Sequence, residues 1–279
     1  MNKYNVINFH ITDKCNFSCK YCFGKFNASE LSLNKAKKVI DSVERYFIKN
    51  DIKDGRINFA GGEPLLYPYL DGLIDYCSQK KINVSIVTNG FLLTSSRIYK
   101  WKNKVCQIGI SIDSKNEATN FNIGRSNNKK TVSENHLIDI SSAIKECGIS
   151  LKINTVVSSL NLNEDLTELY LKIMPEKVKL FKMHIVNGIN DACKNLSISN
   201  NDFYNHCDKY KNLPFNVVIE NQGDMENSYL MIDPSGTLII NNNGKYEKFR
   251  SLIEAELYEE ISNLPLQYSK FMQRYKMES

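Results

Sequence analysis

Three of the eight cysteines lie within one short stretch, at Cys15, Cys19 and Cys22. A Cys-x3-Cys-x2-Cys loop supplies three convergent thiolates, one fewer than a structural zinc ion or an ordinary four-thiolate iron–sulfur cluster takes. Three ligands leave one iron of a 4Fe–4S cube open to a substrate or cofactor. The alternatives are three buried cysteines without a ligand, or a zinc site completed by His10 or Cys207.

A second candidate motif is Gly61-Gly62-Glu63-Pro64, which follows the cysteines by roughly 40 residues. A glycine pair lets the backbone approach a ligand closely, and the Glu63 carboxylate can accept hydrogen bonds from an ammonium group. Taken alone, this motif could equally be an ordinary loop turn.

Five basic residues fall near the ends of predicted strands or in the loops after them. They are Arg56, Arg125, Lys152, Lys177 and Lys179. Several cations of this kind could surround a triphosphate, which carries about four negative charges. Each one alone is more simply a solvated surface charge.

Short strands and amphipathic helices alternate along most of the chain and must position these residues. Strands are predicted at Val6 to Ile11, Arg56 to Phe59, Val84 to Thr88, Gln107 to Ile112, Ser150 to Val157 and Lys177 to Ile185. Helices are predicted over Asn34 to Lys49, and from a capping box at Thr131-Val-Ser-Glu134 to Gly148. The alternation predicts an α/β fold of six parallel βα units, an open partial barrel with its chemistry at the carboxyl ends of the strands.

The pattern changes after Pro214. Strands are predicted at Asn216 to Glu220, and at Tyr229 to Ile232 and Thr237 to Ile240 around a turn at Asp233-Pro-Ser-Gly236. A last helix is predicted over Ser251 to Ser262. We expect residues 1–213 to form the barrel and residues 214–279 to form an extension that closes the active site within the same globular unit.

The composition of the 279 residues is that of a globular protein, with 42% apolar residues, 13 glycines and 6 prolines. These values exclude a collagenous or disordered chain. The net charge of +5 is small and dispersed, which argues against nucleic-acid binding but suits a site for a small polyanion. No apolar run approaches the ~20 residues that cross a bilayer, and the first residues carry no signal-peptide pattern. We therefore expect a cytoplasmic protein with no membrane partner.

The cysteine spacing, with Tyr21 directly before Cys22, resembles that of the radical S-adenosylmethionine (SAM) enzymes. Gly61-Gly62-Glu63-Pro64 resembles the glycine-rich motif with which that superfamily binds the amino group of methionine. Val87 to Gly90 and Ser111 to Asp113 match positions that line the cofactor. The resemblance implies a 4Fe–4S cluster and SAM as cofactors.

A narrower resemblance, to the viperin family, covers nearly the whole chain. Seven motifs occur in the family's order: Asn8 to Thr12, Ile57 to Gly62, Val84 to Gly90, Ile123 to Arg125, Lys152 to Asn154, Lys179 to Phe181 and Asn227 to Leu230. The resemblance implies a partial (β/α)6 radical SAM barrel with a small carboxyl-terminal extension that contains a β-hairpin.

The resemblance also implies a role for each candidate residue. Cys15, Cys19 and Cys22 would hold the cluster, and Tyr21, Gly61, Gly62, Glu63, Thr88, Asn89, Ser111 and Arg125 would bind SAM. Thr12, Arg56, Lys152, Asn154, Lys177, Lys179 and Asn221 would bind the substrate. Arg125 could hold either the SAM carboxylate or the triphosphate. Tyr229 would be the catalytic donor in the last step, although it could also be a packed hairpin aromatic.

Viperins convert a ribonucleoside triphosphate to its 3′-deoxy-3′,4′-didehydro form, with CTP as the animal substrate and CTP, UTP or GTP as prokaryotic ones. The resemblance implies the same lyase chemistry here, with CTP favoured, through abstraction of the 4′ hydrogen by a 5′-deoxyadenosyl radical and loss of water. It further implies an antiviral product, an electron donor such as flavodoxin or ferredoxin, and a monomer that binds no nucleic acid.

Three features depart from the animal viperins. The amphipathic amino-terminal helix that anchors those proteins to lipid is missing, so the resemblance implies no membrane association. Asn241 to Lys245 replaces a more basic stretch, which bears on phosphate contacts and base preference. The chain ends in Met277-Glu-Ser279 without the family's terminal Trp, which bears on closure of the tail and on cluster loading.

Two rival functions are weighed against this one. Other radical SAM enzymes, such as molybdopterin-precursor cyclases and peptide-modifying enzymes, usually carry further clustered cysteines near the carboxyl end, whereas no cysteine follows Cys207. A non-catalytic iron–sulfur or nucleotide sensor would release no 5′-deoxyadenosine, which separates it from an enzyme.

Overall fold

The computed structural model describes residues 2–276, so the tail Met277 to Ser279 lies outside the described residues. The chain forms two compact units. The first unit comprises residues 1–14, 24–86 and 224–279, and the second comprises residues 15–23 and 87–223.

The first unit is built on parallel strands β1 (Val6–His10), β2 (Arg56–Ala60) and β3 (Asn83–Thr88), of which β3 begins here and ends in the second unit. Helices α1 (Leu33–Lys49) and α2 (Leu70–Gln79) follow the first two strands, with the 3-10 turn η1 (Pro64–Leu66) between β2 and α2. The predicted apolar stripe of α1, from Ala36 to Phe47, is buried as expected.

A hairpin joins this sheet at the outer side of β1. Strand β8 (Met231–Ile232) pairs parallel with β1 and antiparallel with β9 (Thr237–Asn242), which pairs with β10 (Lys245–Ser251). The predicted turn between β8 and β9 is confirmed, because Asp233 Oδ1 accepts hydrogen bonds from the backbone N–H groups of Ser235 and Thr237. The unit ends with α9 (Leu257–Glu260), the 3-10 turn η4 (Ile261–Asn263) and α10 (Tyr268–Lys276).

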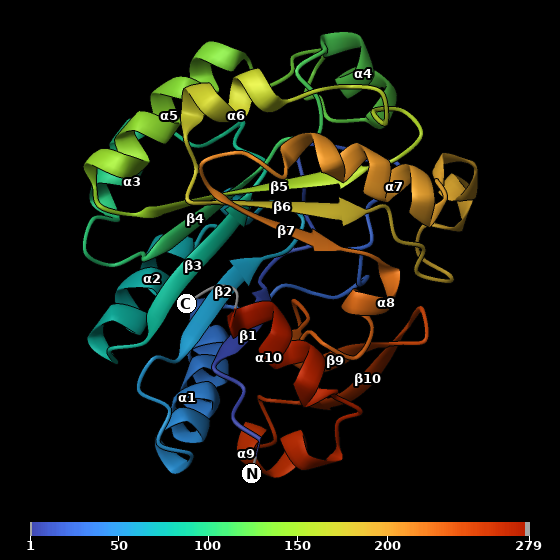
Figure 1. The fold of residues 1–279 in the computed structure, drawn as a ribbon. Coiled ribbons are helices and arrows are strands. Elements are labelled where there is room, and N and C mark those ends of the chain that lie inside the picture. The colour runs from blue at the N-terminus through green and yellow to red at the C-terminus, as the bar shows by residue number, and fades with distance from the viewer. Residues whose placement is uncertain (1, 277–279) are drawn as a thin grey trace. The chain divides into compact units, whose positions relative to one another are not determined.

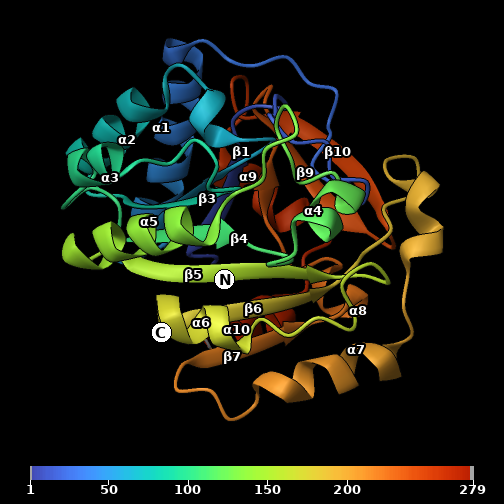
Figure 2. The same cartoon turned by 90° about the horizontal axis from the view of Figure 1, so that it is seen from above.

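The second unit contains four parallel strands in the order β4 (Gln107–Ser111), β5 (Ser150–Val157), β6 (Lys177–Lys182) and β7 (Asn216–Glu220). Figure 2 shows β5, β6 and β7 side by side. The unit's helices are α3 (Ser95–Lys100), α4 (Glu117–Ile123), α5 (Glu134–Glu146), α6 (Thr167–Ile173) and α7 (Asn200–Cys207), with 3-10 turns η2 (Asp191–Leu196) and η3 (Asp208–Tyr210). Helices α3, α5 and α6 form a row outside the strands in Figure 1. The short α8 (Gln222–Met225) begins in this unit and ends in the first.

The parallel strands and intervening helices confirm the predicted α/β architecture. The predicted strand at Asn216 to Glu220 is confirmed and pairs parallel with β6. Three expectations were wrong in detail. The sixth strand ends at Lys182, short of Ile185. Ser251 closes a charged edge strand, so the last predicted helix is only the short α9 with η4. Ser133, rather than Thr131, caps α5, because its hydroxyl accepts from the N–H of His136.

Candidate active site

The cysteine loop is part of the second unit, where backbone hydrogen bonds hold it against the end of α4. Ser18 N–H donates to Gly124 O at 3.0 Å, and Lys20 N–H donates to Ile123 O at 2.9 Å. Gly124 has a φ of 92°, and a Cβ there would lie 2.3 Å from Ser18 O. Glycine is therefore required at position 124 for the loop to lie so close to the helix.

The three sulfur atoms differ in exposure. Cys15 is exposed, whereas Cys19 and Cys22 are partly buried. Burial raises the pKa of the Cys19 thiol to about 12, and the positive charge of Arg125, whose Nη1 lies 3.9 Å from the sulfur, acts in the opposite direction. Since a thiolate binds iron and a thiol does not, Arg125 favours the ligand form of Cys19.

The donor set fits a 4Fe–4S cluster better than a single metal ion. Thiolates are the usual ligands of such clusters, and each binds a different iron of the cube, so the three sulfurs need not converge on one point. Within residues 2–276, no group of three or more His, Cys, Asp or Glu side chains is arranged to hold one metal ion.

Tyr21 of the cysteine loop forms a buried polar cluster with Asp113 and Arg125. The Tyr21 hydroxyl donates to Asp113 Oδ2, and Arg125 Nη1 lies 3.1 Å from the same oxygen. Arg125 Nη2 also donates to the backbone oxygen of Ser111 at 2.5 Å. Burial alone would lower the pKa of Arg125, but Asp113, Cys19 and Tyr21 together outweigh burial and raise the pKa, so the guanidinium stays charged.

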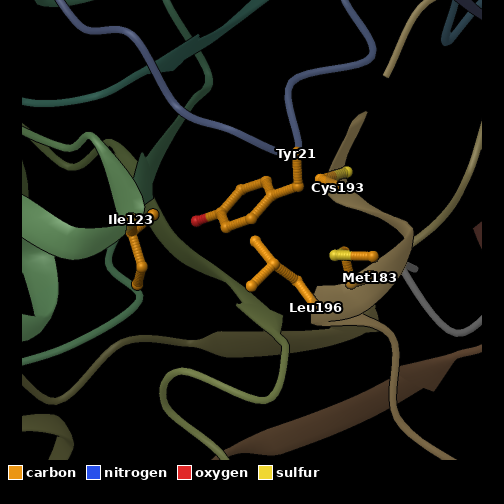
Figure 3. Close-up of a cluster of buried hydrophobic side chains, with 5 residues drawn as sticks. All are labelled: Tyr21, Ile123, Met183, Cys193 and Leu196. Atoms are coloured by element: carbon orange, nitrogen blue, oxygen red, sulfur yellow. The ribbon is translucent and has the colours of Figure 1, made fainter. Parts of the chain in front are cut away.

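Tyr21, which was predicted to bind SAM, has both apolar and polar partners within the protein. The ring of Tyr21 packs with Ile123, Met183, Cys193 and Leu196, as Figure 3 shows, and its hydroxyl is committed to Asp113. Burial and the Asp113 charge raise the pKa of Tyr21 well above its usual value, so the phenol stays neutral. Through these contacts, Tyr21 attaches the cysteine loop to Asp113 and to the apolar cluster.

Thr88 and Asn89 end β3 in a tight turn of the second unit. The Thr88 hydroxyl accepts from the N–H of Gly90 at 3.1 Å, and Asn89 Oδ1 accepts from the N–H of Phe91 at 2.9 Å. Asn89 Nδ2 donates to Asn16 Oδ1 at 2.8 Å and lies 3.9 Å from Cys15 Sγ. Asn89 thus links the strand end to the cysteine loop.

The glycine motif belongs to the first unit, where it packs on the residues that precede Cys15. Gly62 N–H donates to Thr12 O at 2.7 Å, and Glu63 N–H donates to Lys14 O at 2.8 Å. A Cβ on Gly61 would lie 2.4 Å from Thr12 O, and one on Gly62 would lie 2.3 Å from Lys14 O. Both glycines are therefore needed for this close backbone approach.

Two candidate side chains of the first unit already have protein partners. Glu63 is fully buried, and its Oε1 accepts from the N–H of Leu65 at 3.1 Å, which caps η1. The Thr12 hydroxyl donates to Glu30 and accepts from the N–H of Lys14. Burial would raise the pKa of Glu30, but hydrogen bonds from Thr12 and Lys14 outweigh it and lower the pKa.

The candidate substrate residues of the second unit share one face of its sheet. Parallel register places Lys152 beside Lys177 and Asn154 beside Lys179, and residues two apart on a strand point to the same side. The three lysines are 9%, 6% and 3% exposed, and Lys179 forms an ion pair with the buried Glu220 of β7. We call this set, Lys152, Asn154, Lys177, Lys179 and Glu220, the basic face.

Two details suit the basic face to a polar anionic ligand. Asn154 Oδ1 is enclosed and has no hydrogen-bond partner among the described residues, which is costly unless a ligand supplies a donor. Gly109 of the adjacent strand β4 leaves room for the Lys152 side chain, because a Cβ there would lie 3.0 Å from Lys152 Cε.

Arg56 and Asn221 lie outside these groups. Arg56 is the first residue of β2, at the opposite end of that strand from Gly61. Asn221 follows β7 and donates from Nδ2 to the Tyr204 hydroxyl at 2.9 Å.

Tyr229 lies in the first unit and is half-buried against Phe26, Met231 and Ile239. The guanidinium of Arg274 stacks on its ring, with Cζ 3.7 Å from the ring centroid.

The sequence analysis missed Asp113, Glu220 and Arg274 as candidate site residues. Asp113 is the last residue of the motif Ser111 to Asp113, of which only Ser111 was predicted to bind SAM. The spacing of residues in the sequence does not show that Asp113 is buried beside Arg125. Glu220 and Arg274 lie far along the chain from the residues they contact, which left no local signal.

Comparison with known proteins defines the class first. The family model described as the radical SAM superfamily matches residues 9–173. Two solved structures share the fold. Streptococcus suis SuiB bound to S-adenosylmethionine has a TM-score of 0.69 and is 14% identical over 98% of this chain and 68% of that one. Native anSMEcpe with bound AdoMet has a TM-score of 0.66 and is 13% identical over 96% of this chain and 82% of that one. The fold is thus the partial (β/α)6 radical SAM barrel.

Curated relatives narrow the class. The S-adenosylmethionine-dependent nucleotide dehydratase of Flammeovirga pacifica is 32% identical over 96% of this chain and 93% of its own length. The protein of the same name from Psychrobacter lutiphocae is 30% identical over 100% and 97%. The chain therefore belongs to the radical SAM superfamily and, within it, to the family of S-adenosylmethionine-dependent nucleotide dehydratases.

Family membership makes the chain an enzyme that acts on a nucleotide, with a 4Fe–4S cluster and SAM as its cofactors. Across residues 2–276, every helix is too short or too polar to span a bilayer.

Proposed function

We propose that the protein converts a ribonucleoside triphosphate to its 3′-deoxy-3′,4′-didehydro form, with CTP as the favoured substrate and UTP and GTP as the alternatives. The observation that carries this proposal is the basic face. It gathers three ammonium groups on one side of the sheet, and several cations of this kind suit the several negative charges of a triphosphate. The chain's kinship with nucleotide dehydratases supports the same substrate class.

The basic face would bind the nucleotide through separate parts of the molecule. Lys152, Lys177 and Lys179 would offer ammonium groups to phosphate oxygens, and Arg56, which is not part of the basic face, would be a further cation. Asn154 offers an amide whose oxygen lacks a donor, which suits a ribose hydroxyl or the base. Asn221 and Thr12 are further polar contacts for ribose, base or incoming substrate.

Cys15, Cys19 and Cys22 would hold the cluster, and Glu63 would accept hydrogen bonds from the methionine ammonium of SAM. Thr88, Asn89 and Ser111 would line the cofactor. When bound, the cluster and SAM supply the radical that removes the 4′ hydrogen of the ribose. Because its Asp113 and Ser111 contacts fix Arg125 beside Cys19, we assign Arg125 to the cofactor rather than to the triphosphate.

Tyr229 would donate the proton with which the 3′-hydroxyl leaves as water. The remaining electron would come from a low-potential donor such as a flavodoxin or ferredoxin. We further propose that the protein is a cytoplasmic monomer that binds no nucleic acid. Residues 214–279 would be an extension of the same globular unit that closes the active site. The product would be an antiviral terminator of RNA synthesis.

The test is anaerobic turnover of the cluster-reconstituted protein with SAM, dithionite and each of the four ribonucleoside triphosphates in turn. We expect one nucleotide to stimulate 5′-deoxyadenosine release and to lose the mass of water, both followed by mass spectrometry. Cleavage of SAM without any change in a nucleotide would instead favour another radical SAM activity. Absence of 5′-deoxyadenosine in every mixture would favour a non-catalytic sensor.

The cluster assignment has its own test. We expect Cys19→Ala to abolish cluster formation and activity, because one of three ligands is lost. The matched control is Cys193→Ala, a buried cysteine that packs near the loop without belonging to the triad. A full cluster absorption spectrum and iron content in Cys19→Ala would overturn the ligand assignment.

A further inference from the structure

Arg274 of α10 has an unusual position for a charged residue. It is 5% exposed, and its guanidinium stacks on the ring of Tyr229 with Cζ 3.7 Å from the ring centroid. Contacts between a cation and an aromatic ring extend to about 6 Å, so this one is short. Both residues belong to the first unit.

The guanidinium is held in place by the segment that directly precedes Tyr229. Nη1 donates to Ser228 Oγ at 2.6 Å, and Nη2 donates to the backbone oxygen of Asp224 at 2.6 Å. The Ser228 hydroxyl donates to the same Asp224 oxygen at 2.7 Å, which closes the network. Arg274 therefore keeps a fixed position over the Tyr229 ring.

The charge of Arg274 distinguishes two ways in which a phenol can complete the reaction. If Tyr229 gives up a proton, it is left as a phenolate, whose negative charge the neighbouring guanidinium stabilises. If it gives up a hydrogen atom, it is left as a neutral radical, which gains no such stabilisation. A cation over the ring thus favours proton transfer over hydrogen-atom transfer.

We propose that Arg274 is a positioning residue that makes Tyr229 a general acid and prevents it from acting as a hydrogen-atom donor. This inference rests on the proposed function. The O–H bond of Tyr229 breaks heterolytically, and the proton joins the 3′-oxygen of the substrate as the carbon–oxygen bond breaks and water departs. The electron that completes the product comes from the one-electron donor, dithionite or a reduced flavodoxin. The phenolate then takes a proton from solvent.

A double-mutant cycle tests whether Arg274 acts through Tyr229. We expect Arg274→Met to lower the rate of nucleotide dehydration by about 10–100-fold, because the acid loses the cation that stabilises its phenolate. 5′-Deoxyadenosine release should persist, and Arg274→Lys should recover part of the rate. Added to Tyr229→Phe, Arg274→Met should change the rate less than about twofold. An equal loss in both backgrounds would show a structural role and overturn the inference.

Freeze-quench electron paramagnetic resonance during turnover provides an independent test. We expect no tyrosyl radical in the unmodified enzyme. A tyrosyl signal that disappears in Tyr229→Phe would overturn the inference whatever the kinetic result.

The stacking itself can be tested in protein without cluster or substrate. We expect the fluorine resonance of 3-fluorotyrosine at position 229 to move in Arg274→Met and to stay in place in Lys270→Met, a control on the same helix. A resonance that Arg274→Met leaves unmoved would overturn the inference. If the unmodified enzyme dehydrates no nucleotide, the proposed function fails, and the fluorine measurement still reports on Arg274.

Discussion

The two units bury polar side chains on their parallel strands in different ways. In the first unit Asn8, Asn58 and Ser85 lie in register on neighbouring strands and satisfy one another: Asn58 Nδ2 donates to Asn8 Oδ1 at 2.9 Å, and Ser85 Oγ donates to Asn58 Oδ1 at 2.8 Å. In the second unit the basic face is charged, with three buried lysines and the buried Glu220. We call Asn8, Asn58 and Ser85 the neutral ladder. Its side chains find their hydrogen-bond partners within the protein, whereas the charged basic face is suited to a ligand.

The largest expected effect comes from breaking the ion pair of the basic face. Lys179→Met leaves Glu220 buried without its ammonium partner, so we expect the free energy of unfolding to fall by about 3–5 kcal/mol in a denaturant titration. The double variant Lys179→Met/Glu220→Gln should recover much of this loss, because no buried charge is left uncompensated at that position.

The matched control is Lys172→Met, which removes a surface ion pair with Glu134 on the same unit. Exposed ion pairs contribute little, so its effect should be far smaller. If Lys179→Met and Lys172→Met cost the same, the basic face does not differ energetically from the surface.

The second prediction tests whether the interior of the first unit keeps the buried His10 uncharged. Burial lowers the pKa of His10 from 6.5 to about 4, against a smaller opposite effect of the Asp233 charge. Between these pH values the unfolded chain binds a proton that the folded chain excludes, so stability is complete above pH 6.5 and is lost as the pH falls towards 4. The loss amounts to about 3 kcal/mol.

Denaturant titrations of the unmodified protein and of His10→Gln at pH 7, 5.5 and 4.5 would measure this loss. The variant keeps a polar side chain that does not titrate in this range, so its curve should be flatter. Identical pH dependence in the two proteins would mean that His10 accepts a proton inside the fold.

The smallest of the three effects concerns the neutral ladder itself. Asn58→Ala removes the partner of both Asn8 and Ser85, and we expect a loss of about 2 kcal/mol in the free energy of unfolding. Asn5→Ala, which removes an exposed hydrogen bond to Asp54, should cost less. Calorimetric binding of CTP should weaken less in Asn58→Ala than in Lys179→Met/Glu220→Gln, and the reverse order would refute the division of roles between the two faces.

Local patterns account for the parts of the fold that the sequence predicts well. The strands β1 to β6 and the helix α1 follow from apolar runs and helical periodicity, and the Gly61-Gly62 pair is identified by residue type alone. The turn at Asp233 to Gly236 also follows from its composition.

Pairing partners far along the chain decide features that local sequence leaves open. Asn216 to Glu220 has the same local character whichever strand it pairs with, so its parallel pairing with β6 could not be predicted from the sequence. Lys245 to Ser251 carries too many charges to resemble a strand, yet it is stable as an edge with one face exposed. Burial of Lys152, Lys177 and Lys179 is likewise a property of the assembled sheet, because each lysine considered alone is expected at the surface.

The attachment of the cysteine loop to α4 has a consequence for how the enzyme can change. Ser18 and Lys20 hold the loop through main-chain atoms, and Gly124 permits that contact because it has no side chain. The loop therefore accepts any residue at positions 18 and 20 except proline, which has no N–H to donate, and both side chains are exposed. Natural or directed evolution can vary these two side chains while the loop geometry is inherited unchanged, whereas position 124 admits no such variation.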